Sequence, residues 1–182
     1  MNSLPSAVFL DRDGTIIEDV HFISRPEQVR LIDGAADAIA RINAVLVPVI
    51  VVTSQSGIGR GIFTETDYNN VNARMTELLS EHGATIDATY FCPHAPEEGC
   101  ECRKPGTLLY RNAKRDHPEI DLSKALYIGD RMRDVTPAIV LGGNGVLVAS
   151  STTPSADILA ATEKARVAPS LGTALDWYLC SN

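Results

Sequence analysis

The residues Ala7-Val-Phe-Leu-Asp-Arg-Asp-Gly-Thr15 decide the fold of this chain. The run Ala7–Leu10 is short and continuously apolar, which is typical of a strand buried on both faces of a sheet. Two aspartates, Asp11 and Asp13, follow directly, and Gly14 then lets the backbone turn sharply away. In open α/β sheets ligands bind outside the carboxyl ends of the strands, so this end of the run is where chemistry is expected.

Further apolar runs alternate with helical patterns along the chain. The other runs are Val47–Val52, Ala88–Phe91, Ala125–Ile128 and Gly145–Val148. The predicted helices are Gly34–Leu46, Thr64–His82, Thr107–Asp116, Arg131–Leu141 and Leu171–Leu179. This alternation predicts an α/β fold with a doubly wound, mainly parallel sheet, and we expect residues 1–182 to form a single domain. We interpret Ser150–Ser170 as a surface connection that contains a short helix near Ser155–Lys164.

Composition and charge exclude several classes of protein. The chain has 182 residues, of which 45% are hydrophobic and 21% charged, as in ordinary globular proteins. Its net charge of −7 argues against a nucleic-acid partner. No apolar run approaches the roughly 18 residues of a membrane span, because Pro48 breaks the longest one. Met1–Ser6 lacks the features of a signal peptide, so we expect a cytoplasmic protein with no membrane partner. We also expect the protein to be a monomer.

Two pairs of aspartates follow apolar runs. Asp11 and Asp13 would point to one face of an extended segment, so their carboxylates could meet over one site. Asp130 and Asp134 stand at i, i+4 where a helix is predicted to start. Either pair alone could be a turn or a helix cap. Two pairs at strand ends that would be neighbours in the sheet favour a site for Mg²⁺, which prefers oxygen ligands and neutralises like charges.

A cluster of soft metal ligands lies in the segment from Cys92 to Cys102. It contains His94 and Cys100 as well, so three cysteines and one histidine fall within eleven residues. Four such ligands match a closed, tetrahedral structural zinc site, and reduced buried cysteines are the alternative. Cys180 stands apart from this zinc loop, and we interpret it as a packing residue or an idle thiol.

Hydroxyl and cationic side chains follow two other runs. Thr53 begins the sequence Thr-Ser-Gln-Ser-Gly, whose hydroxyls and backbone amides could hold phosphate oxygens or could form an ordinary turn. Lys104 follows Arg103 and precedes Pro105. If a metal ion holds Cys102, the two neighbouring cations are fixed in position rather than mobile.

With these motifs in view, the sequence resembles the haloacid dehalogenase (HAD) superfamily of phosphohydrolases. The family's motifs occur in order as Asp11–Thr15, Thr53, Lys104 and Gly129-Asp130 with Asp134. The cysteine cluster that runs into Cys102-Arg-Lys-Pro105 resembles the subgroup of heptose bisphosphate phosphatases and histidinol-phosphatases. The resemblance covers residues from about Ser6 to Ala149 and implies a HAD-like Rossmannoid fold without a separate cap domain.

The resemblance also implies a mechanism. Asp11 would be the nucleophile that forms an aspartyl-phosphate, and Asp13 the general acid and base. Thr53 and Lys104 would hold the transferring phosphoryl group. The implied magnesium ligands are Asp11, the backbone carbonyl of Asp13, and Asp130, with Asp134 supporting. The implied structural zinc ligands are Cys92, His94, Cys100 and Cys102.

The implied substrate is a small phosphorylated metabolite, because the segments that could roof the site are too short to form a cap. Its expected contacts are Asp19, His21, Ser54, Gln55, Ser56 and Arg103. Ser56–Gly61 resembles the heptose enzymes of lipopolysaccharide biosynthesis, whereas Gly129-Asp130-Arg131 also occurs in histidinol-phosphatases. Ser54 stands where those relatives usually have Asn.

Two classes without catalysis remain as alternatives. A receiver-like signalling domain would also carry a phosphorylated aspartate, but the presence of Asp13 and Lys104 together with Thr53 disfavours it. A zinc-knuckle nucleic-acid module is disfavoured by the net charge and by the absence of interleaved aromatic and basic residues.

Overall fold

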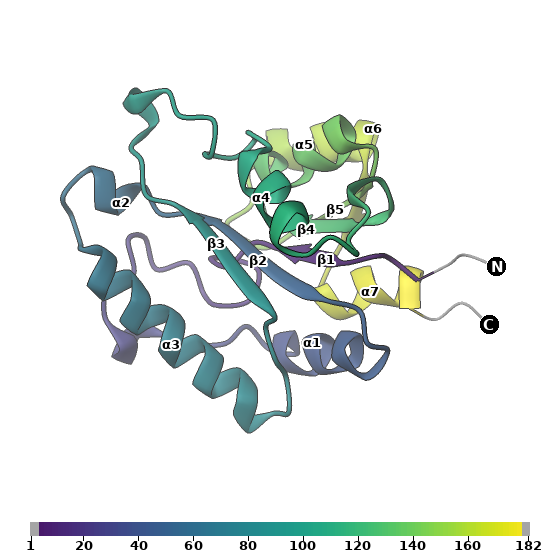
Figure 1. Cartoon of the computed structure of the whole chain (residues 1–182), viewed down its shortest axis with the longest axis horizontal. Coiled ribbons are helices and arrows are strands. Elements are labelled where there is room, and N and C mark those ends of the chain that lie inside the picture. Colours follow the sequence, from purple (N-terminus) through teal and green to yellow (C-terminus); the bar gives the residue numbers. More distant parts are fainter. Residues whose placement is uncertain (1–3, 180–182) are drawn as a thin grey trace.

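The computed structural model of the chain describes residues 4–179 and contains a parallel sheet between two layers of helices (Figure 1). Within those residues the sheet has six strands in the order β3-β2-β1-β4-β5-β6. Their bounds are β1 (Val8–Leu10), β2 (Val49–Ser54), β3 (Ala88–Cys92), β4 (Leu126–Gly129), β5 (Asn144–Val148) and β6 (Arg166–Ala168). Every neighbouring pair is parallel, so the predicted fold class is confirmed. Cys180 lies outside the described residues.

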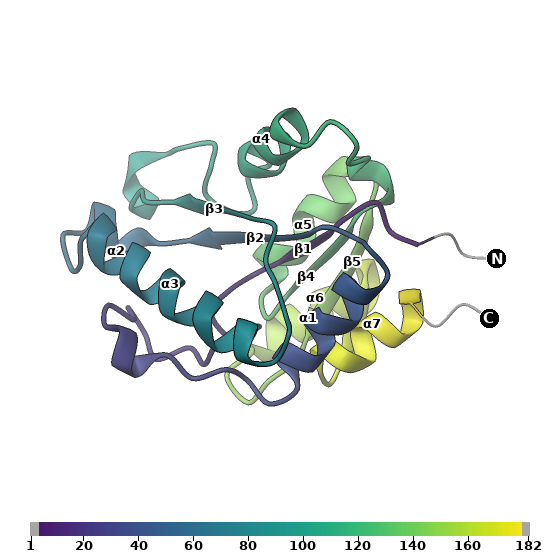
Figure 2. The same cartoon turned by 60° about the horizontal axis from the view of Figure 1, so that its bottom comes forward.

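Helices cover both faces of the sheet (Figure 2). On one side lie α1 (Ala35–Ala44), α3 (Glu65–Glu81) and α7 (Leu171–Leu179). On the other lie α4 (Leu108–Asp116), α5 (Met132–Leu141) and α6 (Ser155–Lys164). One-turn helices are α2 (Ser56–Gly59), η1 (Pro26–Gln28), η2 (Pro96–Glu98) and η3 (Leu122–Lys124). Successive side chains of a strand point to opposite faces, so Val8 and Leu10 pack into one core and Phe9 into the other.

The ends of two helices follow the local sequence. Thr64 caps α3, where its hydroxyl accepts a hydrogen bond from the Asp67 backbone N–H at 3.1 Å. Asp67 in turn accepts one from the Thr64 backbone N–H at 2.8 Å, which completes a reciprocal capping box. Helix α5 ends before Gly142, whose φ of +81° is the left-handed conformation that glycine adopts at helix ends.

Three expectations from the sequence need correction. Ser150–Ser170 is not only a connection with a helix, because β6 within it pairs with β5 and extends the sheet. The apolar run at Ala88–Phe91 predicts a strand buried on both faces, but β3 is an edge strand and most of its residues are half-buried. Helix α1 ends at Ala44, before Leu46, which has a φ of +57° and is 91% exposed.

The order of the strands brings the polar motifs together. Strand β1 lies between β2 and β4, so the residues that follow all three strands share one edge of the sheet. Between β1 and α1 the chain forms a loop with η1 and isolated bridges at Ile17, and no cap domain is present among residues 4–179. No helix within this range is long and apolar enough to cross a membrane.

Candidate active site

Three buried carboxylates meet at the carboxyl edge of the sheet. Asp11 follows β1, Asp130 follows β4, and Asp134 lies in the first turn of α5. Each offers a carboxylate oxygen, and these oxygens all lie within 4.8 Å of one another. Asp134 is fixed further because it accepts a hydrogen bond from the Arg131 backbone N–H at 3.0 Å. The fold therefore joins one aspartate of the first pair to both members of the second.

Lys104 lies between two of these carboxylates. Its Nζ is 2.6 Å from Asp11 Oδ1 and 2.6 Å from Asp134 Oδ1. The same nitrogen donates a hydrogen bond to the Val52 carbonyl at 2.8 Å. Burial alone would lower the pKa of Lys104, but the two carboxylates outweigh it and raise the pKa, so the ammonium group stays charged.

One ammonium group does not neutralise the cluster. Burial, followed by the charge of Asp134, raises the pKa of Asp11 to about 7, although Lys104 opposes this. The same two causes raise the pKa of Asp130 to about 6. Neither buried oxygen of Asp130 accepts a hydrogen bond from the described residues, although Arg131 Nε lies 3.1 Å from Oδ2. Buried, underbonded carboxylate oxygens fit a hard divalent cation, so Asp11, Asp130 and Asp134 could hold Mg²⁺.

The Asp13 carboxylate lies outside this cluster. Arg12 donates to its two oxygens from Nε at 3.1 Å and Nη2 at 3.0 Å. Gln55 Nε2 donates to Asp13 Oδ2 at 2.9 Å and to Thr53 Oγ1 at 2.8 Å. Arg12 is fully buried, and its guanidinium carbon lies 5.2 Å from the centre of the Tyr68 ring. The two aspartates of the first motif have different surroundings. Both side chains line one cavity, as strand alternation predicts, but the Asp13 carboxylate is not among the oxygens of the acidic cluster.

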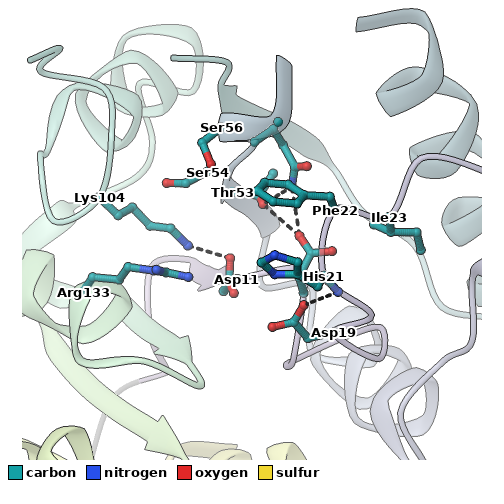
Figure 3. A pocket seen from close by; sticks show the side chains of 13 residues that line it. Asp11, Asp19, His21, Phe22, Ile23, Thr53, Ser54, Ser56, Lys104 and Arg133 are labelled. Carbon is teal, nitrogen blue, oxygen red and sulfur yellow. Dashed lines mark hydrogen bonds and ion pairs between the residues drawn. The ribbon is translucent and has the colours of Figure 1, made fainter. Parts of the chain in front are cut away.

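A cavity of about 190 Å³ is lined by Asp11 and Lys104, and neither Asp130 nor Asp134 lines it (Figure 3). Its lining includes nine of the residues expected in the site: Asp11, Asp13, Asp19, His21, Thr53, Ser54, Gln55, Ser56 and Lys104. Arg103 does not line it, and its Nη1 is buried without a hydrogen bond from the described residues. Gln55 is only 5% exposed and contacts other side chains of the site.

Sequence reasoning missed four lining residues: Phe22, Ile23, Gly57 and Arg133. Phe22, Ile23 and Gly57 have no charged or metal-binding side chain that would mark them in the sequence as site residues. Arg133 does, because a cation in the first turn of a helix is unfavourable next to the positive end of the helix dipole. In Figure 3 it reaches into the cavity beside Lys104, and both point toward Asp11.

The rim opposite Arg133 has an unusual backbone. His21 and Phe22 have φ values of +52° and +55°, a region that residues other than glycine rarely adopt. Their rings are 4.3 Å apart between centroids, and both side chains line the cavity. Asp19 accepts a hydrogen bond from the His21 backbone N–H at 3.1 Å. The loop between β1 and α1 thereby forms one wall of the site.

The zinc loop forms a second ligand cluster. Cys92 Sγ lies 3.5 Å from Cys100 Sγ and 3.1 Å from Cys102 Sγ. His94 Nδ1 lies 3.1 Å from Cys102 Sγ and 3.6 Å from Cys92 Sγ. Zn–S bonds of about 2.3 Å separate the sulfurs of a tetrahedron by roughly 3.8 Å, so these side chains fit a zinc ion with modest adjustment. The cluster lies next to the loop that carries Lys104, which is two residues beyond Cys102.

Comparison with known proteins agrees with this geometry. Residues 101–174 match the family model described as HAD-hydrolase-like. One curated relative is the D-glycero-beta-D-manno-heptose-1,7-bisphosphate 7-phosphatase of Escherichia coli K12, which is 36% identical over 83% of this chain and 84% of the relative. Another is a probable D-glycero-D-manno-heptose-1,7-bisphosphate 7-phosphatase of Thermoplasma volcanium, which is 40% identical over 68% of this chain and 84% of the relative. The chain belongs to the HAD-like hydrolases and is a phosphatase of that family.

A solved structure shows the same relationship in three dimensions. The D,D-heptose 1,7-bisphosphate phosphatase of Bordetella bronchiseptica, crystallised with magnesium and phosphate, aligns with a TM-score of 0.84 at 32% identity. The alignment covers 96% of this chain and 98% of that one. The particular proteins that this chain resembles in both sequence and structure are therefore heptose bisphosphate phosphatases.

Proposed function

We propose that this chain is a Mg²⁺-dependent phosphatase that removes the 7-phosphate of D-glycero-D-manno-heptose-1,7-bisphosphate. The observation that carries the proposal is the meeting of Asp11, Asp130, Asp134 and Lys104, of which Asp11 and Lys104 line a cavity. The curated relatives support this choice of substrate, because several that are 35–40% identical to this chain are heptose bisphosphate phosphatases. Lipopolysaccharide biosynthesis is the pathway that such a substrate implies.

In the proposed first step an Asp11 carboxylate oxygen attacks phosphorus. The new bond is an aspartyl-phosphate, and the bond from phosphorus to the sugar oxygen breaks. Asp13 gives its proton to that oxygen, so the sugar leaves as an alcohol. In the second step Asp13 takes a proton from water, the water oxygen attacks phosphorus, and Asp11 is released with inorganic phosphate. Asp13 is within reach of this chemistry because its side chain lines the same cavity as Asp11.

The other residues of the site bind charge and set geometry. Lys104 Nζ, already beside Asp11, would hold an equatorial phosphoryl oxygen, and Thr53 Oγ1 would hold another. Asp11, Asp130 and the Asp13 backbone carbonyl, with Asp134, would hold Mg²⁺. When bound, this ion supplies the positive charge that lets a phosphate dianion approach the carboxylates.

The proposal also covers the cysteine cluster, the location and oligomeric state of the protein, and its substrate contacts. Zinc held by Cys92, His94, Cys100 and Cys102 would be structural, because four protein ligands leave no open position. Reduced cysteines in such a site suit a cytoplasmic enzyme. We propose that residues 1–182 act as a single domain and as a monomer, with Asp19, His21, Ser54, Gln55, Ser56 and Arg103 as substrate contacts.

A substrate panel tests the function. The purified, zinc-loaded protein is incubated with Mg²⁺ and with the heptose bisphosphate, its 7-phosphate, histidinol phosphate and other sugar phosphates, and phosphate release is measured. We expect the highest kcat/KM with the heptose bisphosphate and no release by Asp11→Asn. A preference for histidinol phosphate would replace the proposed substrate by that of the other subgroup. Turnover by Asp11→Asn would overturn the nucleophile, and absence of Mg²⁺-dependent release would overturn the proposal.

A further inference from the structure

The side chain of Arg12 is fully buried beside the catalytic cavity and does not line it. Asp13 is its only ion-pair partner among residues 4–179. Removing a guanidinium group from water is unfavourable unless its charge is paired and its donors are satisfied. Arg12 Nη1 is buried and donates no hydrogen bond to any described residue. Such incomplete pairing contributes little to stability, so the contact with Asp13 points to a role in the site.

Arg12 holds both oxygens of the Asp13 carboxylate. Its Nη2 donates to Oδ1 at 3.0 Å, and its Nε donates to Oδ2 at 3.1 Å. Oδ2 also accepts hydrogen bonds from Gln55 Nε2 at 2.9 Å and from Thr53 Oγ1 at 3.4 Å. Within the described part of the chain, Oδ1 accepts from Arg12 alone. Arg12 is therefore the contact that prevents the carboxylate from turning about its Cβ–Cγ bond.

An aromatic stack supports the guanidinium group of Arg12. Its central carbon lies 5.2 Å from the centre of the Tyr68 ring, which is within the range of a cation–π contact. Tyr68 is buried, and the centroid of its ring lies 4.3 Å from that of Phe91 on β3. Phe91 pairs in register with Thr53 on β2. The stack therefore links Arg12 both to α3 and to the strand beside Thr53.

The start of α3 fixes the position of Tyr68. The capping box of Thr64 and Asp67 defines the first turn of the helix, and the Tyr68 backbone N–H donates to the Thr64 carbonyl at 3.1 Å. The Tyr68 hydroxyl is buried and has no hydrogen-bond partner among the described residues. What Tyr68 offers to Arg12 is therefore its ring rather than its hydroxyl.

We propose that Arg12, supported by the ring of Tyr68, is a positioning residue that fixes the rotation of Asp13. The carboxyl group is then oriented before substrate binds, which favours proton transfer to the leaving oxygen. Arg12 does not line the cavity, so it acts through Asp13 and not on the substrate. The inference rests on the proposed function, because only there does Asp13 have to donate a proton.

The variant Arg12→Met tests this role in zinc-loaded protein with Mg²⁺, because methionine removes the charge and the donors but keeps an unbranched side chain. We expect kcat/KM for the sugar phosphate to fall about tenfold or more, since general acid catalysis contributes about 10²- to 10⁴-fold. With p-nitrophenyl phosphate, whose leaving group needs no proton, we expect a fall of less than about threefold. Inhibition by inorganic phosphate should not change. Equal losses with both substrates would overturn the proposal, because Arg12 would then support the whole site.

The chain offers a matched control in Arg115→Met. Arg115 also binds the carboxylate of the next residue, from Nε to Asp116 Oδ1 at 2.9 Å and from Nη2 to Oδ2 at 3.3 Å. This pair is exposed on α4 and neither residue lines the cavity, so both rates should stay unchanged. Arg12→Lys keeps the charge, but an ammonium group is not a planar fork, so we expect rates below those of the wild type. Wild-type rates in Arg12→Lys would overturn the bidentate role.

Variants of Tyr68 test the stack without altering Arg12 or Asp13. Tyr68→Phe keeps the ring and should behave as the wild type. Tyr68→Leu removes the ring face and should lower kcat/KM for the sugar phosphate more than for the aryl phosphate. Normal rates with both substrates in a folded Tyr68→Leu protein would overturn the part of the proposal that concerns Tyr68.

A double-mutant cycle shows whether Arg12 acts through Asp13. A positioning residue has no effect once the group that it positions is removed, so adding Arg12→Met to Asp13→Asn should lower the rate by less than about twofold. A further loss as large as that of Arg12→Met in the wild-type background would overturn the proposal.

Crystal structures of the wild type and of Arg12→Met give a readout that does not depend on turnover. We expect the Asp13 side chain of the variant to occupy more than one conformer, while Asp11 and Lys104 keep their contact. A single, unchanged Asp13 conformer would overturn the proposal. If the wild type prefers another alkyl phosphate in the panel, the kinetic comparison is made with that substrate. If the wild type releases no phosphate, the proposed function fails, and the two structures still decide whether Arg12 positions Asp13.

Discussion

Lys104 Nζ and Asp11 Oδ1 lie 2.6 Å apart in the buried centre of the site, although 93 residues separate them along the chain. Their contact links the loop after the cysteine cluster to the end of β1. The proposed nucleophile is therefore paired with the cation that would later hold the transferring phosphoryl group.

Replacing Lys104 by Met tests this pairing. Loss of one charged donor at a developing phosphoryl charge lowers kcat by about 10²- to 10³-fold, and we expect a loss of that order in steady-state assays. Lys114→Met, on the exposed side of α4, is the control and should retain activity. Near-normal kcat in a folded Lys104→Met protein would exclude the clamp role.

The acidic cluster predicts how magnesium stabilises the protein at different pH values. The folded protein raises the pKa of Asp11 to about 7 and that of Asp130 to about 6, from 3.8 in each case. Between pH 4 and pH 7 the folded state therefore binds more protons than the unfolded state, and without metal its stability falls as the pH rises. Mg²⁺ competes with those protons, so its stabilising effect should grow in this range.

Thermal unfolding of zinc-loaded protein measures the effect. We expect 10 mM Mg²⁺ to raise Tm more at pH 8 than at pH 5. The double variant Asp11→Asn, Asp130→Asn serves as control and should show a small shift at both values. A Tm shift that is the same at pH 5 and pH 8 in the wild type would contradict the assignment.

The contacts of Gln55 predict that the effect of replacing it on kcat depends on the leaving group of the substrate. Its amide donates to both Asp13 and Thr53, so Gln55→Met removes a contact that positions the proposed general acid. An alkyl phosphate needs a proton on its leaving oxygen, whereas p-nitrophenyl phosphate does not. We expect kcat to fall about tenfold or more with the sugar phosphate and less with the aryl phosphate, since general acid catalysis contributes about 10²- to 10⁴-fold. Equal losses would indicate a general structural role.

The zinc loop predicts an effect on substrate binding. Removal of zinc, or Cys100→Ser, should release the loop that carries Lys104, because the cluster is only two residues away. We expect reduced metal content, a lower Tm and a higher KM, with zinc restoring the stripped wild type and not the variant. Full activity in protein shown to be zinc-free would contradict the positioning role.

The position of Gly14 beside Asp130 predicts that a side chain there would disturb the metal cluster. A Cβ at Gly14 would lie 2.6 Å from Asp130 Oδ2, and the residue has a φ of +86°. Gly61 has a φ of +67° and nothing within 4 Å of its Cβ position, so Gly61→Ala is a control for backbone strain alone. We expect both alanine variants to lose stability, about 1 kcal/mol or more each, and only Gly14→Ala to lose Mg²⁺ affinity. Equal Mg²⁺ affinities would show that the contact with Asp130 is unimportant.

Local patterns along the chain were enough to predict the fold class and the ligand types. Continuous apolar runs are typical of strands buried on both faces, although β3 is a half-buried edge strand, and their alternation with helical periodicity favours a parallel sheet. Most helix ends were also predictable, because capping depends on residues close together in the sequence, such as the capping box at Thr64 and the glycine after α5. The close spacing of Cys92, His94, Cys100 and Cys102 already indicated that their side chains meet.

Which distant side chains meet, and which way they point, depends on how the whole chain packs. The separation of Asp13 from the acidic cluster depends on the buried Arg12 and on Gln55, and local alternation contains no information about either contact. Strand β6 forms only because β5 offers an edge to pair with. The place of Arg133 in the cavity depends on how α5 packs, and packing between distant segments is a property of the assembled chain rather than of any short sequence pattern.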